Sequence, residues 1–269
     1  MKKNRLIPVL LLKNGWLVQS KGFKRHQNLG NPVTAVKRLS EWAADEIIYL
    51  DISKEETYDI RREDQGYPNR SSFVEIIEDV AKVTFMPMTV GGKIQNLSDI
   101  EKRLSLGADK ISINTQALDD RKFIAHAARE FGSQCVVVSI DAKRINDKYL
   151  VMSRGGQEKT SYDPVKWAKI VEAEGAGEIL LNSIDRDGAK TGYDIELLSA
   201  VSESVKIPVI ALGGVGEWGH FAEAFDKTKV DAVAAANIFN YTDQSVYRAK
   251  TYLYENGYNV RSPDLLIIK

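Results

Sequence analysis

The chain has 269 residues, of which 43% are hydrophobic and 28% charged, and its 37 basic residues balance its 37 acidic ones. This balance gives no bulk charge that would favour nucleic acid or an anionic membrane surface. No apolar stretch approaches the roughly 18 residues that a membrane span needs. We therefore expect a cytoplasmic protein. Because α/β barrels of roughly 250 residues are commonly single domains, we also expect one domain over residues 1–269.

Short apolar runs alternate with amphipathic segments along the chain. Most runs are apolar nearly throughout, which is typical of parallel strands buried on both faces. They predict strands over residues 6–12, 46–52, 84–90, 109–113, 135–141, 178–183, 207–212 and 231–235. The segments between them predict helices over residues 33–44, 71–83, 96–106, 122–131, 163–174, 195–202 and 217–225. Eight such units indicate either a closed barrel or an open doubly wound sheet.

An internal repeat favours the barrel. Gly91-Gly92 follows the third predicted strand and Gly213-Gly214 follows the seventh, and each pair precedes a helix. The next strand then begins with Asp109 in the first copy and with Asp231 in the second, at the same separation from the glycines. Two half-barrels that close on each other explain this repeat. We therefore predict an α/β fold, a (βα)8 barrel made of two repeated halves.

Three segments interrupt the alternation. Residues 19–32 are rich in glycine, asparagine and lysine and predict a mobile loop, residues 53–70 are long and charged, and residues 145–160 predict a small hairpin. All three follow strands, so they belong to the C-terminal face of the barrel, where barrel enzymes hold their active sites. The first segment carries three cations that could meet an anion there, Lys21, Lys24 and Arg25.

The two glycine pairs suggest phosphate sites. Glycine lets a phosphate approach the backbone, and the helix that follows offers free N–H groups at its positive end. Two pairs in symmetric positions suggest a ligand with a phosphate at each end, although tight turns also use glycine pairs. Residues at neighbouring strand ends could complete the sites. The predicted phosphate-binding residues are Gly91, Gly92, Asn114, Thr115, Asp187, Gly188, Gly213, Gly214 and Asn237.

Carboxylates follow several strands and could act as general acids or bases in the barrel mouth. They are Asp51, Asp141, Asp185 and Asp187. An aspartate at such a place can instead cap the next helix, but Asp141 precedes Ala-Lys-Arg rather than an apolar helix start. The three histidines are scattered without ligand spacing, so we predict neither a metal site nor a cofactor.

Four charged residues stand at the starts of predicted strands. They are Arg5, Glu46, Lys110 and Glu178, two of each sign. The starts of parallel strands meet at the floor of a barrel, so these side chains could form a closed ring there. Their spacing alone favours a purely structural cluster of ion pairs.

Several segments resemble the cyclase subunit of imidazole glycerol phosphate synthase, the HisF family. They are residues 107–115, 131–144, 175–181, 183–188, 192–194 and 259–261, and the resemblance extends over nearly the whole chain. In that family a glutaminase subunit, HisH, docks on the barrel floor, and ammonia passes a charged gate and the barrel to reach a bisphosphorylated ribulosyl substrate. The resemblance implies that the four strand-start charges are this gate. It also implies that Asp109 faces the glutaminase and that Asp141 is one of two catalytic aspartates.

The chain departs from the family pattern at the mouth of the barrel. The second catalytic aspartate falls on Leu11, which cannot transfer a proton, and the lysine that closes over the substrate falls on Gln19. The third glycine after strand 3 is Lys93. Polar positions near the second phosphate are Asn182, Leu212 and Asn237, and residues 53–70 are longer than in typical members.

These departures favour a diverged paralogue that keeps the ammonia gate and the glutaminase dock but serves another acceptor. Such paralogues resemble this chain and occur in gene sets for bacterial surface polysaccharides. They are thought to supply ammonia for the conversion of an acetamido sugar to an acetamidino sugar by a separate sugar amidotransferase. Two alternatives stay open. The chain could be a genuine cyclase that uses Asp51 or Asp185 as its other acid, or a non-catalytic barrel that activates a glutaminase and conducts ammonia.

Overall fold

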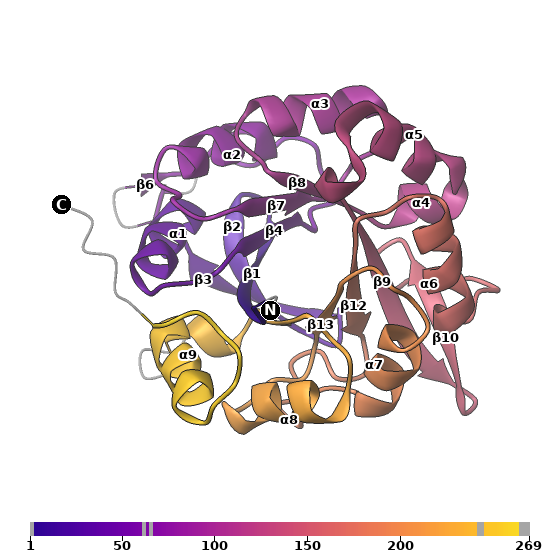
Figure 1. The fold of residues 1–269 in the computed structure, drawn as a ribbon. Helices are drawn as coiled ribbons and strands as arrows, with labels where there is room; N and C mark the ends of the chain where they lie inside the picture. Colours follow the sequence, from indigo (N-terminus) through magenta and orange to yellow (C-terminus); the bar gives the residue numbers. More distant parts are fainter. Residues whose placement is uncertain (1–2, 61–62, 65–66, 241–244, 264–269) are drawn as a thin grey trace.

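The computed structural model describes residues 3–60, 63–64, 67–240 and 245–263. Eight parallel strands form a closed barrel with helices around its outside (Figure 1). The barrel strands pair in chain order, and the last pairs with the first to close the ring. The (βα)8 barrel is thereby confirmed over an open sheet. The strands are β1 (Arg5–Lys13), β4 (Ile47–Asp51), β7 (Met88–Gly91), β8 (Lys110–Ile113), β9 (Val136–Ile145), β12 (Glu178–Ser183), β13 (Val209–Leu212) and β14 (Ala232–Ala235).

Helices occupy every predicted segment between the strands. They are α1 (Pro32–Glu41), α2 (Phe73–Ala81), α3 (Leu97–Ser105), α4 (Thr115–Asp119), α5 (Lys122–Phe131), α6 (Pro164–Ala173), α7 (Ile195–Ser202), α8 (Gly219–Lys227) and α9 (Val246–Glu255), with 3-10 turns η1 (Ser133–Cys135) and η2 (Ile238–Asn240). The strand predicted over residues 84–90 begins only at Met88, because Pro87 has no N–H to donate to a neighbouring strand. None of the helices in the described part of the chain is long and apolar enough to cross a membrane.

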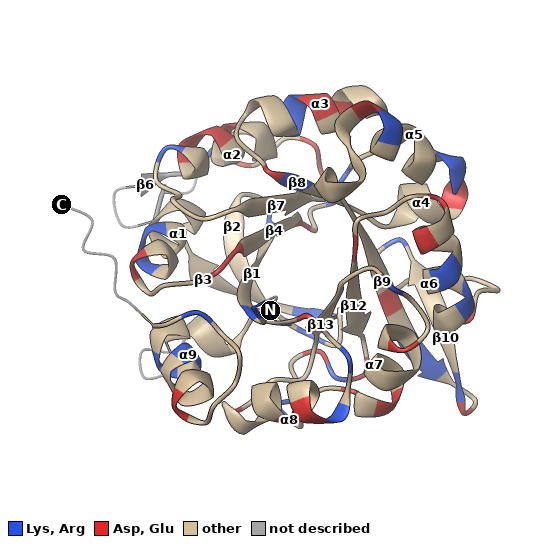
Figure 2. Ribbon diagram, in the orientation of Figure 1, with Lys and Arg blue, Asp and Glu red and all other residues tan. Residues whose placement is uncertain are grey.

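Apolar side chains fill both the inside of the barrel and the layer between strands and helices. Along β1, Ile7 and Val9 lie in the interior cluster with Leu11 at its edge, whereas Leu6 and Leu10 face the helices. This alternation follows from the two-residue period of a strand. Charged residues lie mainly on the outer helices and loops, while the barrel strands are largely uncharged (Figure 2). The interior of the barrel is therefore an apolar core with charged groups at its two ends.

Residues 19–32 are not the mobile loop that their composition predicts. Residues 19–30 belong to a hairpin, β2 (Trp16–Lys21) and β3 (Arg25–Gly30), that pairs with the end of β1, and Asn31 caps α1, which begins at Pro32. The turn from β1 into β2 is Asn14-Gly15, with φ of 51° and 81°. Positive φ at both central residues is the hairpin turn that an Asn-Gly pair favours. That dipeptide, flanked by apolar runs, was the signal for a hairpin in the sequence.

The other two segments also contain short strands. The hairpin predicted within residues 145–160 is confirmed, with β10 (Lys148–Ser153) pairing with β9 and with β11 (Glu158–Lys159). In the segment over 53–70, β5 (Glu63–Asp64) pairs with β6 (Tyr67–Pro68). Residues 61–62 and 65–66 of that segment lie outside the described residues. Both segments follow barrel strands and therefore sit at the mouth end.

Equivalent aspartates of the two half-barrels make the same hydrogen bond at the barrel floor. Asp109 Oδ2 accepts a hydrogen bond of 2.8 Å from the Met88 N–H, and Asp231 Oδ2 accepts one of 3.2 Å from the Val209 N–H. Each aspartate thus ties the start of its own strand to the start of the preceding one. Asp109 is exposed at the floor. It therefore has a structural contact in addition to the glutaminase contact that the resemblance implies, which stays a prediction.

Candidate active site

A ring of four charges closes the floor of the barrel. The Arg5 guanidinium lies 2.6 Å from Glu46 and 3.1 Å from Glu178, and the Lys110 ammonium lies 3.1 Å from each of the same two carboxylates. Charges of opposite sign therefore alternate around the ring. The four side chains are only 10–17% exposed. They meet because all four residues stand at or next to the starts of parallel strands, which share one edge of the barrel.

The ring favours the charged forms of Glu46 and Arg5. Burial works against the charge of Glu46, but Arg5 and Lys110 outweigh it and lower the pKa of that carboxyl. Burial likewise opposes the charge of Arg5, and the attraction of Glu178 and Glu46 nevertheless raises its pKa. The Nε and Nη2 atoms of Arg5 are buried and find no partner among the described residues. The ring therefore retains unused hydrogen-bond donors at the base of the barrel.

Asp141 is the protonatable group at the opposite end. It lies in β9, is 8% exposed, and accepts hydrogen bonds from Asn114 Nδ2 at 2.7 Å and Asn182 Nδ2 at 3.2 Å. Burial raises the pKa of Asp141 to about 6, against the two amide donors and with a further contribution from Asp187. A group with a pKa near neutrality can both accept and return a proton under ordinary conditions. Asp141 thus suits acid–base chemistry.

The raised pKa of Asp141 predicts a pH-dependent stability effect. An unfolded aspartate titrates near pH 3.9, so the folded chain retains a proton between about pH 4 and pH 6 that the unfolded chain has lost. Stability therefore falls across this interval, by about 3 kcal/mol for a difference of roughly two pH units. Asp141→Asn should remove this cost. It should raise the free energy of unfolding at pH 7.5 and leave it nearly unchanged at pH 4.

Denaturant unfolding of the wild type and the variant at both pH values measures this difference. Asn182 still donates to the new amide oxygen. Asn114 can rotate to present its buried Oδ1, which has no partner among the described residues, to the new NH2 group. An equal effect of the substitution at pH 4 and pH 7.5 would show that the pKa of Asp141 is not raised in the folded chain.

The second glycine pair lies in a small pocket at the mouth. The pocket brings together several residues predicted to bind phosphate, and its lining is Asp187, Gly188, Leu212, Gly213, Gly214, Val215, Ala235, Ala236 and Asn237. The β2–β3 hairpin closes over it, because Ser20 Oγ donates to the Asp187 carboxylate at 2.7 Å and Asn237 Nδ2 donates to the Ser20 carbonyl at 2.8 Å. Gly214 has a φ of 109°, and a Cβ there would lie 2.1 Å from the Gly192 carbonyl oxygen.

The first glycine pair lies across the mouth, beside Asp51. Gly92 has a φ of 105°, and a Cβ there would lie 2.3 Å from the carbonyl oxygen of Asp51. Asn114 contacts Asp141, and Thr115 Oγ1 accepts a hydrogen bond of 3.1 Å from the Arg154 N–H. Backbone geometry alone accounts for glycine at Gly92 and at Gly214. Phosphate binding at either pair therefore stays a prediction.

Comparison with known proteins agrees with this geometry. The family model described as histidine biosynthesis protein matches residues 5–245. The imidazole glycerol phosphate synthase subunit HisF of Hydrogenobaculum sp. (strain Y04AAS1) is 44% identical over 262 residues, which cover 97% of this chain and all of that protein. HisF of Clostridium botulinum (strain Okra / Type B1) is 42% identical over 263 residues, with the same coverage. The chain belongs to the HisF family. The resemblance seen in the sequence is thereby confirmed.

The resemblance to HisF implies that the second catalytic aspartate falls on Leu11, and this assignment stays a prediction. Leu11 packs against the interior cluster at the mouth end and pairs with Leu50 of β4. Asp51, the nearest strand-end carboxylate in sequence, is fully engaged. It accepts from Tyr58 Oη at 2.8 Å, from the Ser53 N–H at 2.9 Å and from the Ser53 hydroxyl, and Lys93 Nζ lies 3.6 Å away. Asp51 is thus held as a structural acceptor.

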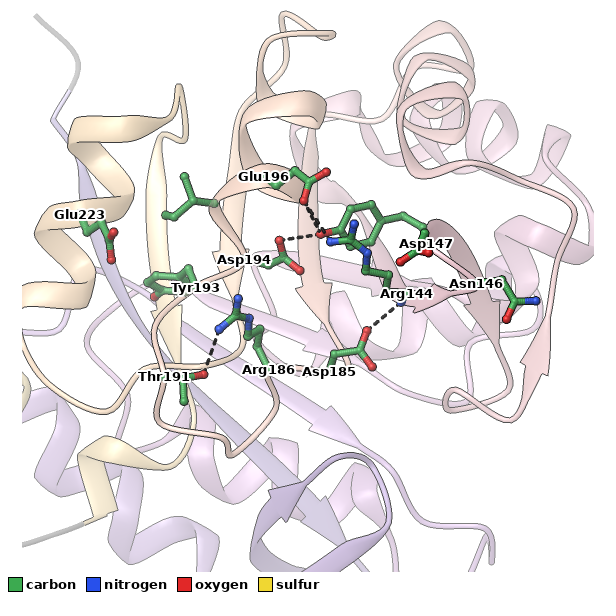
Figure 3. Close-up of a pocket in the computed structure, with 12 residues that line it drawn as sticks. Arg144, Asn146, Asp147, Asp185, Arg186, Thr191, Tyr193, Asp194, Glu196 and Glu223 are labelled. Atoms are coloured by element: carbon green, nitrogen blue, oxygen red, sulfur yellow. Dashed lines mark hydrogen bonds and ion pairs between the residues drawn. The ribbon is translucent and has the colours of Figure 1, made fainter.

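Asp185, the other alternative acid, lies outside the mouth. Its carboxylate accepts a hydrogen bond of 2.7 Å from the Arg144 N–H and lines a pocket of about 670 Å3 between the β9–β10 hairpin and the β12–α7 loop (Figure 3). In the same pocket Tyr149 donates to Asp194 at 2.9 Å. Sequence reasoning did not find this pocket, because it forms where two loops meet rather than at a strand end.

No group of three or more histidine, cysteine, aspartate or glutamate side chains among the described residues is arranged to hold a metal ion.

Proposed function

We propose that this chain is the synthase subunit of a two-component glutamine amidotransferase. A HisH-like glutaminase docks on the barrel floor, and its ammonia enters through the ring of Arg5, Glu46, Lys110 and Glu178. The observation that carries the proposal is the closed ring at one end of an apolar barrel, with Asp141 buried at the other. The two HisF relatives are named as subunits of imidazole glycerol phosphate synthase, and their high identity over their full lengths supports a shared plan.

The apolar interior of the barrel favours the passage of neutral ammonia over that of the charged ammonium ion. Ile7, Val9, Ile48 and Leu180 are among its fully buried members. Moving a charge into such surroundings is costly, whereas neutral ammonia carries no net charge and loses only hydrogen bonds. The charged ring marks the polar end of this path, and the spare donors of Arg5 can hold a neutral nitrogen through its lone pair. Ammonia thus reaches the mouth as a nucleophile.

Asp141 accepts and returns the protons that the reaction transfers. When the ammonia nitrogen bonds to a carbonyl carbon of the acceptor, the nitrogen must lose a proton, and the Asp141 carboxylate accepts it. Asp141 returns this proton to the carbonyl oxygen, and a second proton of the nitrogen follows the same route as the C=N bond forms, so that the oxygen leaves as water. Asn114 and Asn182 hold the carboxylate in place through both stages. One acid–base residue suffices for this exchange of oxygen for nitrogen.

The acceptor differs from the bisphosphorylated ribulosyl substrate of the family. With Leu11 at the position of the family's second proton-transferring aspartate, the barrel suits an exchange of oxygen for nitrogen that needs one acid–base residue. We propose a diverged paralogue that serves acetamidino-sugar formation for surface polysaccharide, with a sugar amidotransferase as a further partner. The specific competing function is the histidine-pathway cyclase, which the identity of 44% to a HisF favours.

Complementation separates these two functions. The chain would be expressed in a bacterial histidine auxotroph that lacks HisF, with the Clostridium botulinum HisF as the positive control. We expect growth without histidine from the control only. Growth supported by this chain would show that a genuine cyclase tolerates Leu11 and would replace the proposed acceptor.

A further inference from the structure

A buried side chain in the pocket at the second glycine pair has an acceptor without a donor. Asn237 lines this pocket and is 9% exposed, and its Oδ1 is buried without a partner among the described residues. Its Nδ2 donates to the Ser20 carbonyl at 2.8 Å, which fixes the orientation of the amide, because the reverse orientation would place two oxygens together. A buried acceptor that lacks a donor is costly. A ligand that donates a hydrogen bond would remove this cost.

The charge of this pocket disfavours an anion. Asp187 is the one charged residue among the described residues that line it. The neighbouring Arg186 points into the outer pocket and donates to Thr191 at 3.0 Å (Figure 3). Lys21 of the hairpin lies beside Gly188, but it is exposed and does not belong to the lining. A phosphate in this pocket would therefore face a carboxylate without a cation in the lining, and like charges repel.

Backbone N–H groups just before α8 are already engaged. The helix begins at Gly219, so residues 215–218 separate it from the glycine pair. The Gly216 N–H donates to His220 Nδ1 at 3.0 Å, and the Glu217 N–H donates to the same atom at 3.4 Å. His220 thus occupies donors that the start of a helix could otherwise offer to an anion. The turn is therefore a poorer phosphate site than its glycine pair suggests.

The rest of the lining is apolar and leaves little room. Leu212, Val215 and Ala235 are only 3–9% exposed. The pocket has a volume of about 20 Å3, and one water-sized group needs about 10–15 Å3 of such volume. A single hydroxyl or amide N–H group fits this space, whereas a phosphoryl group with its several oxygens is too large.

We propose that this pocket binds an uncharged hydrogen-bond donor of the acceptor, a hydroxyl or an amide N–H group, which donates to Asn237 Oδ1. The apolar wall of Leu212 and Val215 contacts the carbon that bears this group. The substrate class is therefore a sugar that is uncharged at the end that enters the second half of the mouth. The inference rests on the proposed function only in taking the barrel mouth as the acceptor site.

Asn237→Ala tests the inference with N-acetylglucosamine, an uncharged sugar that carries both kinds of donor. Its Kd, measured on the full chain by ligand-observed NMR, should rise about 3- to 10-fold with the loss of one hydrogen bond. Glucose should show the same loss if a hydroxyl is the donor, and no loss if the amide N–H is. Asn240→Ala is the matched control, because Asn240 Nδ2 also donates to a backbone carbonyl, that of Ala236 at 2.9 Å, but does not line the pocket. Its Kd should stay within about twofold of the wild type.

A competition experiment on the wild type depends on no variant. Inorganic phosphate should not displace N-acetylglucosamine, and displacement would overturn the inference in favour of a phosphate subsite. Unchanged affinity in Asn237→Ala would also overturn it. So would an equal loss in Ser20→Ala, which removes the contact of the hairpin with Asp187 and leaves the Asn237 amide in place. If the wild type binds no N-acetylglucosamine, the inferred substrate class is wrong. Ammonia transfer has its own assays and is not affected by that result.

Discussion

Asp141→Asn should reduce ammonia incorporation by a factor of about 10²–10⁴, because it removes the side chain that we propose as the acid–base group of the barrel mouth. The amide keeps the shape of the side chain and can keep its contacts with Asn114 and Asn182. The loss should appear in kcat, with glutamine and with added ammonium salt alike, since both routes deliver ammonia to the same site. The readout is nitrogen incorporated into the acceptor by the complex, or output of the pathway in a cell that depends on this chain.

Two controls make the result decisive. The variant should be at least as stable as the wild type at pH 7.5, so a loss of activity cannot come from unfolding. Asp185→Asn changes a carboxylate of the outer pocket and should leave the rate within about twofold. Unchanged output from Asp141→Asn would mean that the barrel does no chemistry and only conducts ammonia to its partner.

Arg5→Met should destabilise the chain. It should also lower the rate with glutamine by more than the rate with added ammonium salt. The substitution leaves Glu46 and Glu178 facing a single cation, Lys110, at a site that is mostly shielded from water. Breaking a buried pair costs about 3–5 kcal/mol, and the partial exposure of this ring reduces the expected cost to about 2–4 kcal/mol. Denaturant unfolding measures this loss. The double variant Arg5→Met/Glu178→Gln, which removes one charge of each sign, should lose less than the single variant.

The effect of Arg5→Met on activity distinguishes an ammonia gate from a structural cluster of ion pairs. If the ring admits ammonia, Arg5→Met should lower the rate with glutamine by more than the rate with ammonium salt, which can also enter from the mouth. Both rates would be measured at a temperature where the variant is folded. If the two rates fall together, the ring only stabilises the barrel, as the spacing of its residues in the sequence alone suggested.

The barrel was predictable because its signals are local and repeated. Apolar runs with regular spacing identify the strands, and the equal separation of the glycine pairs from Asp109 and Asp231 identifies the two halves. The ring followed from topology, since residues at the starts of parallel strands must share one end of a barrel. Spacing could not assign it a role, because ion pairs at a barrel floor are equally compatible with a structural function.

Features that depend on contacts between distant segments could not be predicted. The composition of residues 19–32 indicated a loop, although Asn14-Gly15 signals a hairpin turn in the preceding segment. Asp185 and Asp141 both follow apolar strands in the sequence, yet Asp185 lines the outer pocket and Asp141 is buried in the mouth. Arginine on a polar helix is usually exposed, so the sequence gives no sign that Arg103 of α3 is 7% exposed and donates to the Gly92 carbonyl oxygen. Only the fold shows that it lies beneath the glycine turn.

The central claim is that an ammonia entrance is kept while the acceptor has changed. The most direct test is a steady-state assay of the purified chain with ammonium salt and the bisphosphorylated ribulosyl substrate of the HisF family. The Clostridium botulinum HisF would be assayed under the same conditions. We expect kcat/KM at least about 100-fold below that of the relative, as the loss of one member of an acid–base pair implies. Turnover at the rate of the relative would contradict the claim and identify the chain as a working cyclase.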